Sequence, residues 1–180
     1  MSFRIGEKVV YPNHGIGIIE QISSKQIAGN DNSFYHLRLS ATNSVVMVPI
    51  NNAKQVGLRS PIDTTDCDRL LKLLSENFCS PPADWKDRFK DFSDKMRTGN
   101  IFSVAEILKN LTYLSQLKPL SFREKRMLER ARFLVVSELA IVSKRPEPQI
   151  AEMVDMALRK ACMKHDRKLA RPLVAKVAAN

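Results

Sequence analysis

The spacing of hydrophobic residues changes along the chain near residue 60. Before this point, short β-branched or alternating runs are separated by turn sequences such as Pro12-Asn13-His14-Gly15, which is typical of strands joined by tight turns. From about residue 66 onward, apolar residues recur at intervals of three and four, which is typical of amphipathic helices. The pattern predicts an α+β protein, with a small SH3- or Tudor-like β-barrel of four or five strands at residues 1–60 and an all-α bundle of about five helices at residues 61–180. We expect a barrel of this kind to recognise another protein.

Capping residues predict where the helices begin and end. Asp84 precedes one helix, and Gly99 suits the left-handed residue that follows its end. Ser121 and Glu124 have the spacing of a capping box at the start of a long helix, whose first half is basic and whose second half is apolar. The predicted helices are a short one ending near 77, then 85–98, 101–116 (or a start at Ser103), 121–142 and a last one from 150.

The helix predicted at 85–98 carries the only tryptophan of the chain. At about 100° per residue, one narrow stripe of this helix holds Trp85, Phe89, Phe92 and Met96. Basic residues flank the stripe and acidic residues lie opposite. The stripe could meet a polyanion, or it could be the buried side of an ordinary amphipathic helix with solvated charges. From this helix alone, the buried alternative is favoured.

The chain is strongly basic. It has 29 Lys and Arg against 19 Asp and Glu, a formal net charge of +10, and 23 of the basic residues lie beyond residue 60. This balance indicates a nucleic acid or another polyanion as partner, with solubility as the weaker alternative. The tail from Arg159 has seven basic residues and one acid; it extends the last helix as far as Pro172 or stays loose until it meets phosphate.

No arrangement of residues predicts catalysis. GxxxxGK[ST] and GxGxxG sequences are absent. His14, His36 and His165 have no partner at metal-ligand spacing, so we interpret them as a turn, a strand and a tail histidine. The acids of the 85–98 helix are expected to pair with Arg88 and Lys95. We therefore expect no enzyme, no metal, no cofactor and no small-molecule substrate.

The cysteines and the apolar runs indicate a cellular compartment. Cys67, Cys79 and Cys162 are odd in number and lack CxxC spacing, which predicts reduced thiols in a cytosolic protein. The N-terminus has no apolar stretch long enough for a signal peptide. No run approaches the roughly 18 apolar residues of a membrane span. We expect a cytoplasmic protein without a membrane partner.

The opening segment, residues 3–17, contains Val-Val-Tyr-Pro followed by one variable residue and His-Gly. It resembles the start of the CarD/CdnL family of bacterial transcription regulators, although a related domain also occurs in transcription-repair coupling factors. The resemblance covers about residues 1–160 and continues at 48–49, 56–59, 85–90, 99, 104–106 and 120–128. The helical part favours the stand-alone regulator, since a coupling factor would need ATPase motifs that this sequence lacks.

The resemblance implies a function for each part of the chain. In this family, the Tudor-like domain binds the β subunit of RNA polymerase. The helical domain contacts promoter DNA at the upstream edge of the melted bubble, where a tryptophan matching Trp85 wedges into the minor groove and stabilises the open complex. Residues 1–60 are thus expected to bind polymerase and residues 61–180 to bind DNA, in the cytoplasm at the nucleoid. The implied DNA-binding residues are Trp85, Lys86, Arg88, Lys90, Lys125 and Arg126. The implied polymerase-binding residues are Lys25, Met47 and Pro49.

Three positions qualify this resemblance. Met47 stands where some members carry a basic residue important for the polymerase contact, whereas Lys25 keeps a positive charge at another such position. Asp87 stands where some relatives are basic. Two alternatives remain: an architectural protein that coats DNA through its basic tail without polymerase, and a protein-binding adaptor with Trp85 in its core.

Overall fold

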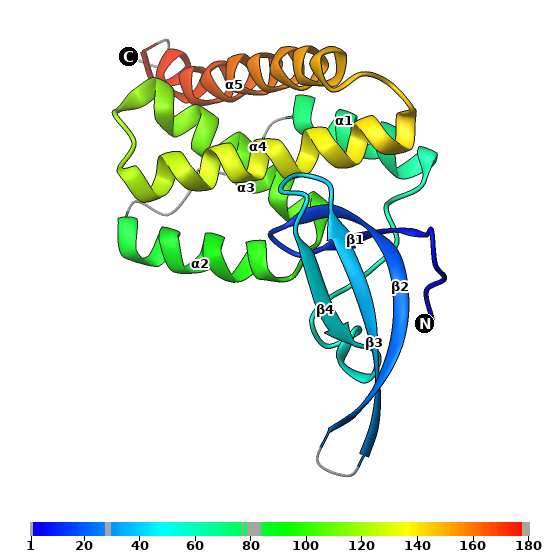
Figure 1. The fold of residues 1–180 in the computed structure, drawn as a ribbon. Coiled ribbons are helices and arrows are strands. Elements are labelled where there is room, and N and C mark those ends of the chain that lie inside the picture. The colour runs from blue at the N-terminus through cyan, green and yellow to red at the C-terminus, as the bar shows by residue number, and fades with distance from the viewer. Residues whose placement is uncertain (1, 28–29, 77, 79–83, 178–180) are drawn as a thin grey trace.

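A computed structural model of the protein describes residues 2–27, 30–76, 78 and 84–177, with side chains for all of these except 25–27, 30–32, 85 and 167–177. The described chain forms a four-stranded sheet followed by five helices, which confirms the predicted α+β class (Figure 1). The strands are β1 (Lys8–Tyr11), β2 (Gly15–Ile27), β3 (Asn30–Leu39) and β4 (Val45–Pro49), and the short 3-10 helix η1 (Ile50–Asn52) follows them. The helices are α1 (Thr64–Ser75), α2 (Trp85–Arg97), α3 (Ile101–Leu117), α4 (Phe122–Ser143) and α5 (Glu147–Val177).

The sheet is an antiparallel meander in the order β1-β2-β3-β4. Two of its strands are longer than the hydrophobic pattern predicts, because β2 and β3 have 13 and 10 residues. Residues 23–26 are polar, so the hydrophobic pattern does not predict the second half of β2. The β2–β3 hairpin projects away from the helices (Figure 1). A register shift between Ile19 and Gln21 leaves Glu20 outside the regular pairing, and such bulges bend a strand.

The inner face of the sheet forms a closed apolar core. Ile19 and Leu37 are fully buried there, together with Tyr35. The ring of Phe3 meets Tyr35 edge-on at 5.8 Å, and the Tyr35 hydroxyl accepts a hydrogen bond of 3.0 Å from the Phe3 backbone N–H. These contacts fix the N-terminal segment against the sheet.

Side-chain caps begin the helices much as predicted. Asp84 accepts hydrogen bonds from backbone N–H groups in the first turn of α2, and Ser121 forms the reciprocal capping box with Glu124 at the start of α4. Asn100 caps α3, so the alternative start at Ser103 is wrong. Gly99, with φ of 70°, is left-handed directly after α2, as predicted.

His165 lies inside the helical bundle, which corrects its interpretation as a tail histidine. Only 3% of its surface is exposed, and its ring stacks on Phe78 at 4.5 Å and meets Tyr113 edge-on at 4.7 Å. The Tyr113 hydroxyl donates a hydrogen bond of 2.9 Å to Asp166. The basic tail prolongs α5 beyond this cluster, and the helix continues past Pro172 to residue 177.

The turn between β1 and β2 joins the sheet to the helices. A Cβ atom on Gly15 would lie 2.9 Å from the ring of Phe133 in α4, and a Cβ atom on Gly99 would lie 2.8 Å from the ring of Pro12. Both glycines have positive φ angles. The absence of a side chain therefore permits both the left-handed backbone and the close approach of the neighbouring ring. The Val-Tyr-Pro-x-His-Gly motif therefore packs the sheet against α4 and the α2–α3 connection.

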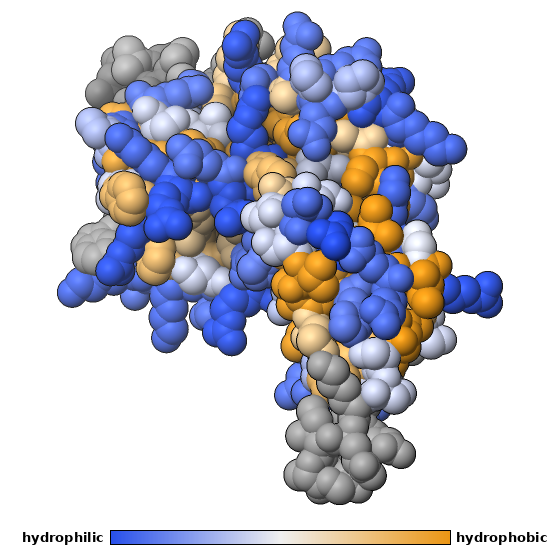
Figure 2. All heavy atoms as spheres, viewed as in Figure 1, coloured by the Kyte–Doolittle hydropathy of each residue, from blue (hydrophilic) through white to orange (hydrophobic). Residues whose placement is uncertain are grey.

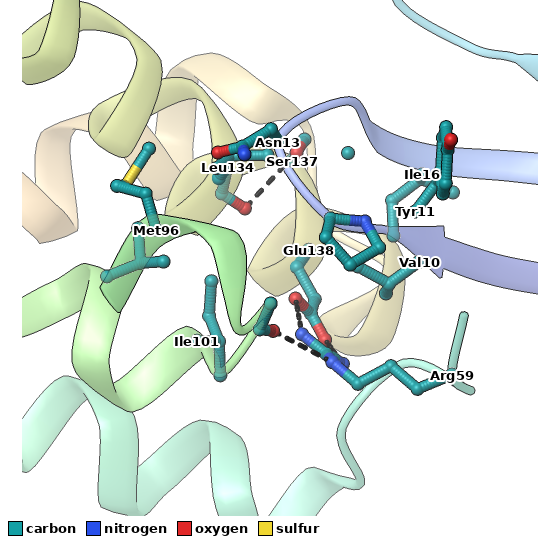
Figure 3. Close-up of a pocket in the computed structure, with 14 residues that line it drawn as sticks. Val10, Tyr11, Asn13, Ile16, Arg59, Met96, Ile101, Leu134, Ser137 and Glu138 are labelled. Carbon is teal, nitrogen blue, oxygen red and sulfur yellow. Dashed lines mark hydrogen bonds and ion pairs between the residues drawn. The ribbon is translucent and has the colours of Figure 1, made fainter. Parts of the chain in front are cut away.

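Arg59 fastens this junction. Its backbone pairs with Val10 of β1, and its Nε donates to the carbonyl of Gly99 at 3.0 Å. Its two terminal nitrogens bind both carboxylate oxygens of Glu138 in α4, at 2.6 and 2.9 Å (Figure 3). Glu138 is only 2% exposed and also accepts a hydrogen bond from the backbone of Ile62. One guanidinium thus connects the sheet, the α2–α3 connection and α4.

Candidate nucleic-acid interface

A groove of about 440 Å³ lies between α2 and α4. The two helices run in the same direction (Figure 1), and Arg88 of α2 contacts Glu124 of α4 near their starts. We call this groove the arginine groove. The described residues that line it are Asn13 from the β1–β2 turn, Phe89, Ser93, Met96 and Arg97 from α2, and Arg123, Arg126, Met127 and Arg130 from α4.

Three exposed arginines of α4 face the groove together. Arg123, Arg126 and Arg130 are spaced by three and four residues, which places them on one side of the helix. Each guanidinium lies over an aromatic ring, with Arg123 at 5.7 Å from the centre of Phe89. Stacking on an aromatic ring limits the freedom of an arginine while its donors stay available.

The lining chemistry suits an anion. None of the described residues that line the groove is acidic. On α2, Lys86, Lys90 and Arg97 follow one another at intervals of four and seven, so they share the side of the helix that carries Ser93. Cations from two helices therefore surround one concave surface, where their fields add and attract negative charge.

Arg88 departs from its predicted role as a DNA contact. Its side chain is 2% exposed and binds the carboxylate of Glu124 at 2.8 Å. The residue therefore lies between α2 and α4 and cannot present its charge to a phosphate at the surface. The sequence suggested that acids of its own helix would pair with it, as Asp91 does with Lys95; the ion pair with Glu124 instead holds the two helices of the groove together.

The Arg88–Glu124 pair predicts a pH dependence of stability. Burial alone would raise the pKa of the Glu124 carboxyl, but hydrogen bonds from Arg88 and from Ser121 bring that pKa below its ordinary value of 4.5. A carboxyl with a lowered pKa in the folded state stabilises the protein above its unfolded pKa, and this stabilisation is lost as the pH falls. When the pH is lowered from above 4.5 to below it, the free energy of unfolding should fall more for the wild type than for Glu124→Gln. Urea titrations at each pH measure this free energy. Equal losses would contradict the assignment.

A second surface lies on the outer face of the sheet. Strand pairing aligns three rows of residues on this face: Ile18, Arg38 and Val45; Gln21, His36 and Met47; Ser23, Phe34 and Pro49. Met47 is 41% exposed, and Ile18 and Val45 are similarly open. We call these nine residues the outer face.

The two surfaces differ in character. Figure 2 shows hydrophobic side chains gathered over the sheet, whereas the surface over α2 and the beginning of α4 is mostly hydrophilic. The outer face has one ion pair at its edge, between Arg38 and Glu20, both partly exposed. Exposed apolar residues gathered on one face, here Ile18, Val45 and Met47, are typical of a protein-binding surface.

Comparison with known proteins identifies the family. The CarD-like/TRCF RID domain matches residues 3–62, and the CarD C-terminal domain matches residues 69–155. A relative from Bacillus subtilis (strain 168), named "Putative transcription factor YdeB", is 32% identical over 148 residues, which are 82% of this chain and 97% of the relative. The chain belongs to the CarD family. It is a CarD-family transcription regulator, and the RID match is consistent with binding to RNA polymerase.

Two solved structures from Myxococcus xanthus are similar to part of the chain. One is described as CdnLNt; it is 42% identical, covers 33% of this chain and 84% of its own, and has a TM-score of 0.29. The other is the solution NMR structure of the 72-residue N-terminal domain of CarD; it is 34% identical, covers 33% of this chain and 79% of its own, and also has a TM-score of 0.29.

The residues predicted from the CarD resemblance fall into three groups. Arg126 lines the arginine groove, and the exposed Lys86 and Lys90 flank it. Lys125 is exposed but lies on another side of α4, and Arg88 is buried. Trp85 is the first residue of α2, at the end of the groove near Glu124; its side chain lies outside the described residues.

The residues that the CarD resemblance predicts to contact RNA polymerase lie along the outer face of the sheet or continue its series. Met47 and Pro49 belong to adjacent rows of the outer face. Lys25 pairs with Asn32 two positions beyond Ser23, so its backbone continues the same series, although its side chain lies outside the described residues.

Sequence reasoning missed three residues that line the groove. Arg97, Arg123 and Arg130 converge with Arg126, although none of the three was named as a DNA contact. The spacing of Arg123, Arg126 and Arg130 was a usable pattern, because it places three cations on one side of a helix. Arg97 shares one side of α2 with Lys86 and Lys90, but its position in the groove depends on how α2 packs against α4.

In the described ranges, no group of three or more His, Cys, Asp or Glu residues could hold a metal ion. None of the helices in the same ranges has the length and apolar character needed to cross a bilayer.

Proposed function

We propose that the protein is a non-enzymatic regulator that binds the β subunit of RNA polymerase through residues 1–60 and promoter DNA through residues 61–180. It would act in the cytoplasm at the nucleoid and would stabilise the open promoter complex. The observation that carries this proposal is the pair of unlike surfaces on one joined unit: an outer face on the sheet that exposes Ile18, Val45 and Met47, and a cationic groove between α2 and α4.

The DNA side of the proposal depends on the arginine groove. Phosphate contacts by Lys and Arg supply most sequence-independent affinity for DNA, and arginine binds phosphate with two donors at once. Trp85 begins α2 beside these cations. An aromatic side chain at this place would wedge into the minor groove at the upstream edge of the bubble, while the arginines hold the backbone. Bubble collapse would then require the wedge to leave.

The polymerase side of the proposal depends on the outer face. Its open apolar residues, Ile18, Val45 and Met47, would pack against the β subunit with less ionic character than in family members with a basic residue at position 47. Interfaces of this type obtain much of their energy from a few central residues. Met47, in the middle row, is the best candidate for such a residue.

Two variants should separate the two contacts. Trp85→Ala should shorten the lifetime of the open complex about fivefold, the loss expected for one aromatic stack, with polymerase binding unchanged. Met47→Glu should weaken retention by polymerase about tenfold, with DNA binding by the free protein unchanged. Open-complex lifetime is measured after a heparin challenge, and retention is measured on immobilised β subunit.

The pattern of results decides between the proposal and its alternatives. An unchanged lifetime with folded Trp85→Ala would exclude the wedge. Tight DNA binding by the free protein would favour an architectural DNA-binding protein if Met47→Glu also left the open-complex lifetime unchanged. Loss of both activities in either variant would indicate a folding defect, which circular dichroism detects.

A further inference from the structure

The floor of the arginine groove is apolar, which a simple phosphate clamp does not require. Phe89, Met96 and Met127 line the groove beneath the arginines, and Ser93 and Asn13 add neutral polar groups. Cations that protrude from a protein surface are sufficient to contact the phosphates of a DNA duplex. A concave site that combines an apolar floor with cations suits a ligand that has both a flat apolar part and a phosphate.

Phe89 is the part of the floor best placed to receive such a group. The next two residues of its stripe, Phe92 and Met96, are 3% and 5% exposed, whereas Phe89 is only half-buried. Its ring also carries the guanidinium of Arg123 at 5.7 Å from its centre. Aromatic rings and guanidinium planes are the surfaces on which unpaired bases stack in single-strand-binding proteins.

The groove is large enough to hold a single nucleotide. Its volume of about 440 Å³ falls in the range of about 300–1,000 Å³ that is usual for small-ligand sites. A base within a duplex is stacked on both faces and paired at its edge, so it cannot reach a ring that lies between two helices. An unpaired base can leave the stack at small cost.

We propose that the arginine groove receives one unpaired nucleotide of promoter DNA, with its base against Phe89 and its phosphates on Arg123, Arg126 and Arg130. This inference rests on the proposed function and extends it, because a melted promoter offers unpaired nucleotides beside the duplex. The groove would then hold the strand that has left the duplex, at a site separate from the Trp85 wedge. Release of this nucleotide would have to precede bubble collapse.

The test compares two DNA probes with the full-length chain at low ionic strength. One probe is a duplex with a single unpaired 5-iodouracil, and the other is the same duplex with that base paired. The unpaired probe should bind about fivefold tighter or more, measured by fluorescence anisotropy. Irradiation should crosslink the iodouracil to Phe89, as mapped by mass spectrometry.

Two variants at position 89 sharpen the result. Phe89→Leu should lower affinity for the unpaired probe more than for the paired probe and so remove the preference, whereas Phe89→Tyr should keep the preference because its ring still stacks. Circular dichroism melting checks that both variants fold, and the crosslink on the wild type does not depend on either.

The outcomes separate this inference from the proposed function. Equal affinity for both probes, or a crosslink at Trp85 in place of Phe89, would overturn the nucleotide site while DNA binding stands. No binding to either probe, with or without polymerase, would overturn the proposed function and the nucleotide site together.

Discussion

Replacing Arg59 by alanine should lower the free energy of unfolding by about 3–5 kcal/mol, the cost of leaving a buried charge without its partner. Glu138 would keep only the backbone N–H of Ile62 as its described donor, although its carboxylate is 2% exposed. The carbonyl of Gly99 would lose the Arg59 donor as well. Urea unfolding followed by circular dichroism measures the loss.

A double replacement shows whether the loss comes from the unpaired charge. Arg59→Met with Glu138→Leu removes both charges and keeps similar side-chain volume, and such replacements of buried ion pairs are often nearly neutral. The double variant should therefore be more stable than Arg59→Ala. The matched control is Arg38→Ala, which breaks the more exposed pair with Glu20 and should cost far less stability than Arg59→Ala, because water screens exposed ion pairs. Equal losses for Arg59→Ala and Arg38→Ala would contradict the role of the junction.

The junction has a consequence for the proposed function. A wedge stabilises open DNA only if the protein that holds it is itself anchored, and here the proposed anchor is polymerase on the outer face. Arg59 and the Pro12 turn fix the sheet against α4 and the α2–α3 connection. The arginine groove also lies between α2 and α4. A loosened junction should thus reduce open-complex lifetime even where each surface binds its own partner normally.

Much of the fold could be predicted because its determinants are local. Turn residues and β-branched runs marked the strands, and Asp84, Ser121 and Gly99 marked helix ends by chemistry that acts within a few residues. The long β2–β3 hairpin was harder, because residues 23–26 are polar and its pairing depends on the neighbouring strand. His165 was misplaced because burial of a histidine depends on Phe78 and Tyr113, which are distant in sequence.

The candidate site could be predicted only in part, for a related reason. The sequence of α2 favoured burial of its stripe, and the structure buries Phe92 and Met96 but leaves Phe89 half-buried, where it lines the groove. Whether a cation faces solvent depends on the helix packed against it. Arg88 meets Glu124 across that contact and is buried, whereas Arg123 meets Phe89 and stays exposed. Periodicity along one helix does not contain this information.

The arginine groove should account for most of the DNA affinity of the free protein. Changing Arg123, Arg126 and Arg130 together to glutamine should reduce affinity about 100-fold near physiological salt, because each lost phosphate contact removes about 0.9 from the slope of log affinity against log salt. The three side chains are exposed, so their loss should cost little stability beyond their ring contacts, about 0.5–1 kcal/mol each. Anisotropy titrations with duplex DNA at several salt concentrations give both the affinity and the slope.

Two single variants test whether position, and not charge alone, produces this effect. Arg145→Gln removes an exposed cation just beyond the far end of α4 and should leave both affinity and slope nearly unchanged. Lys125→Gln removes an exposed cation from another side of α4, so a loss as large as that for Arg126→Gln would show that the DNA path extends beyond the groove. Equal losses for Arg126→Gln, Lys125→Gln and Arg145→Gln would contradict the groove as the binding site, because only net charge would then determine affinity.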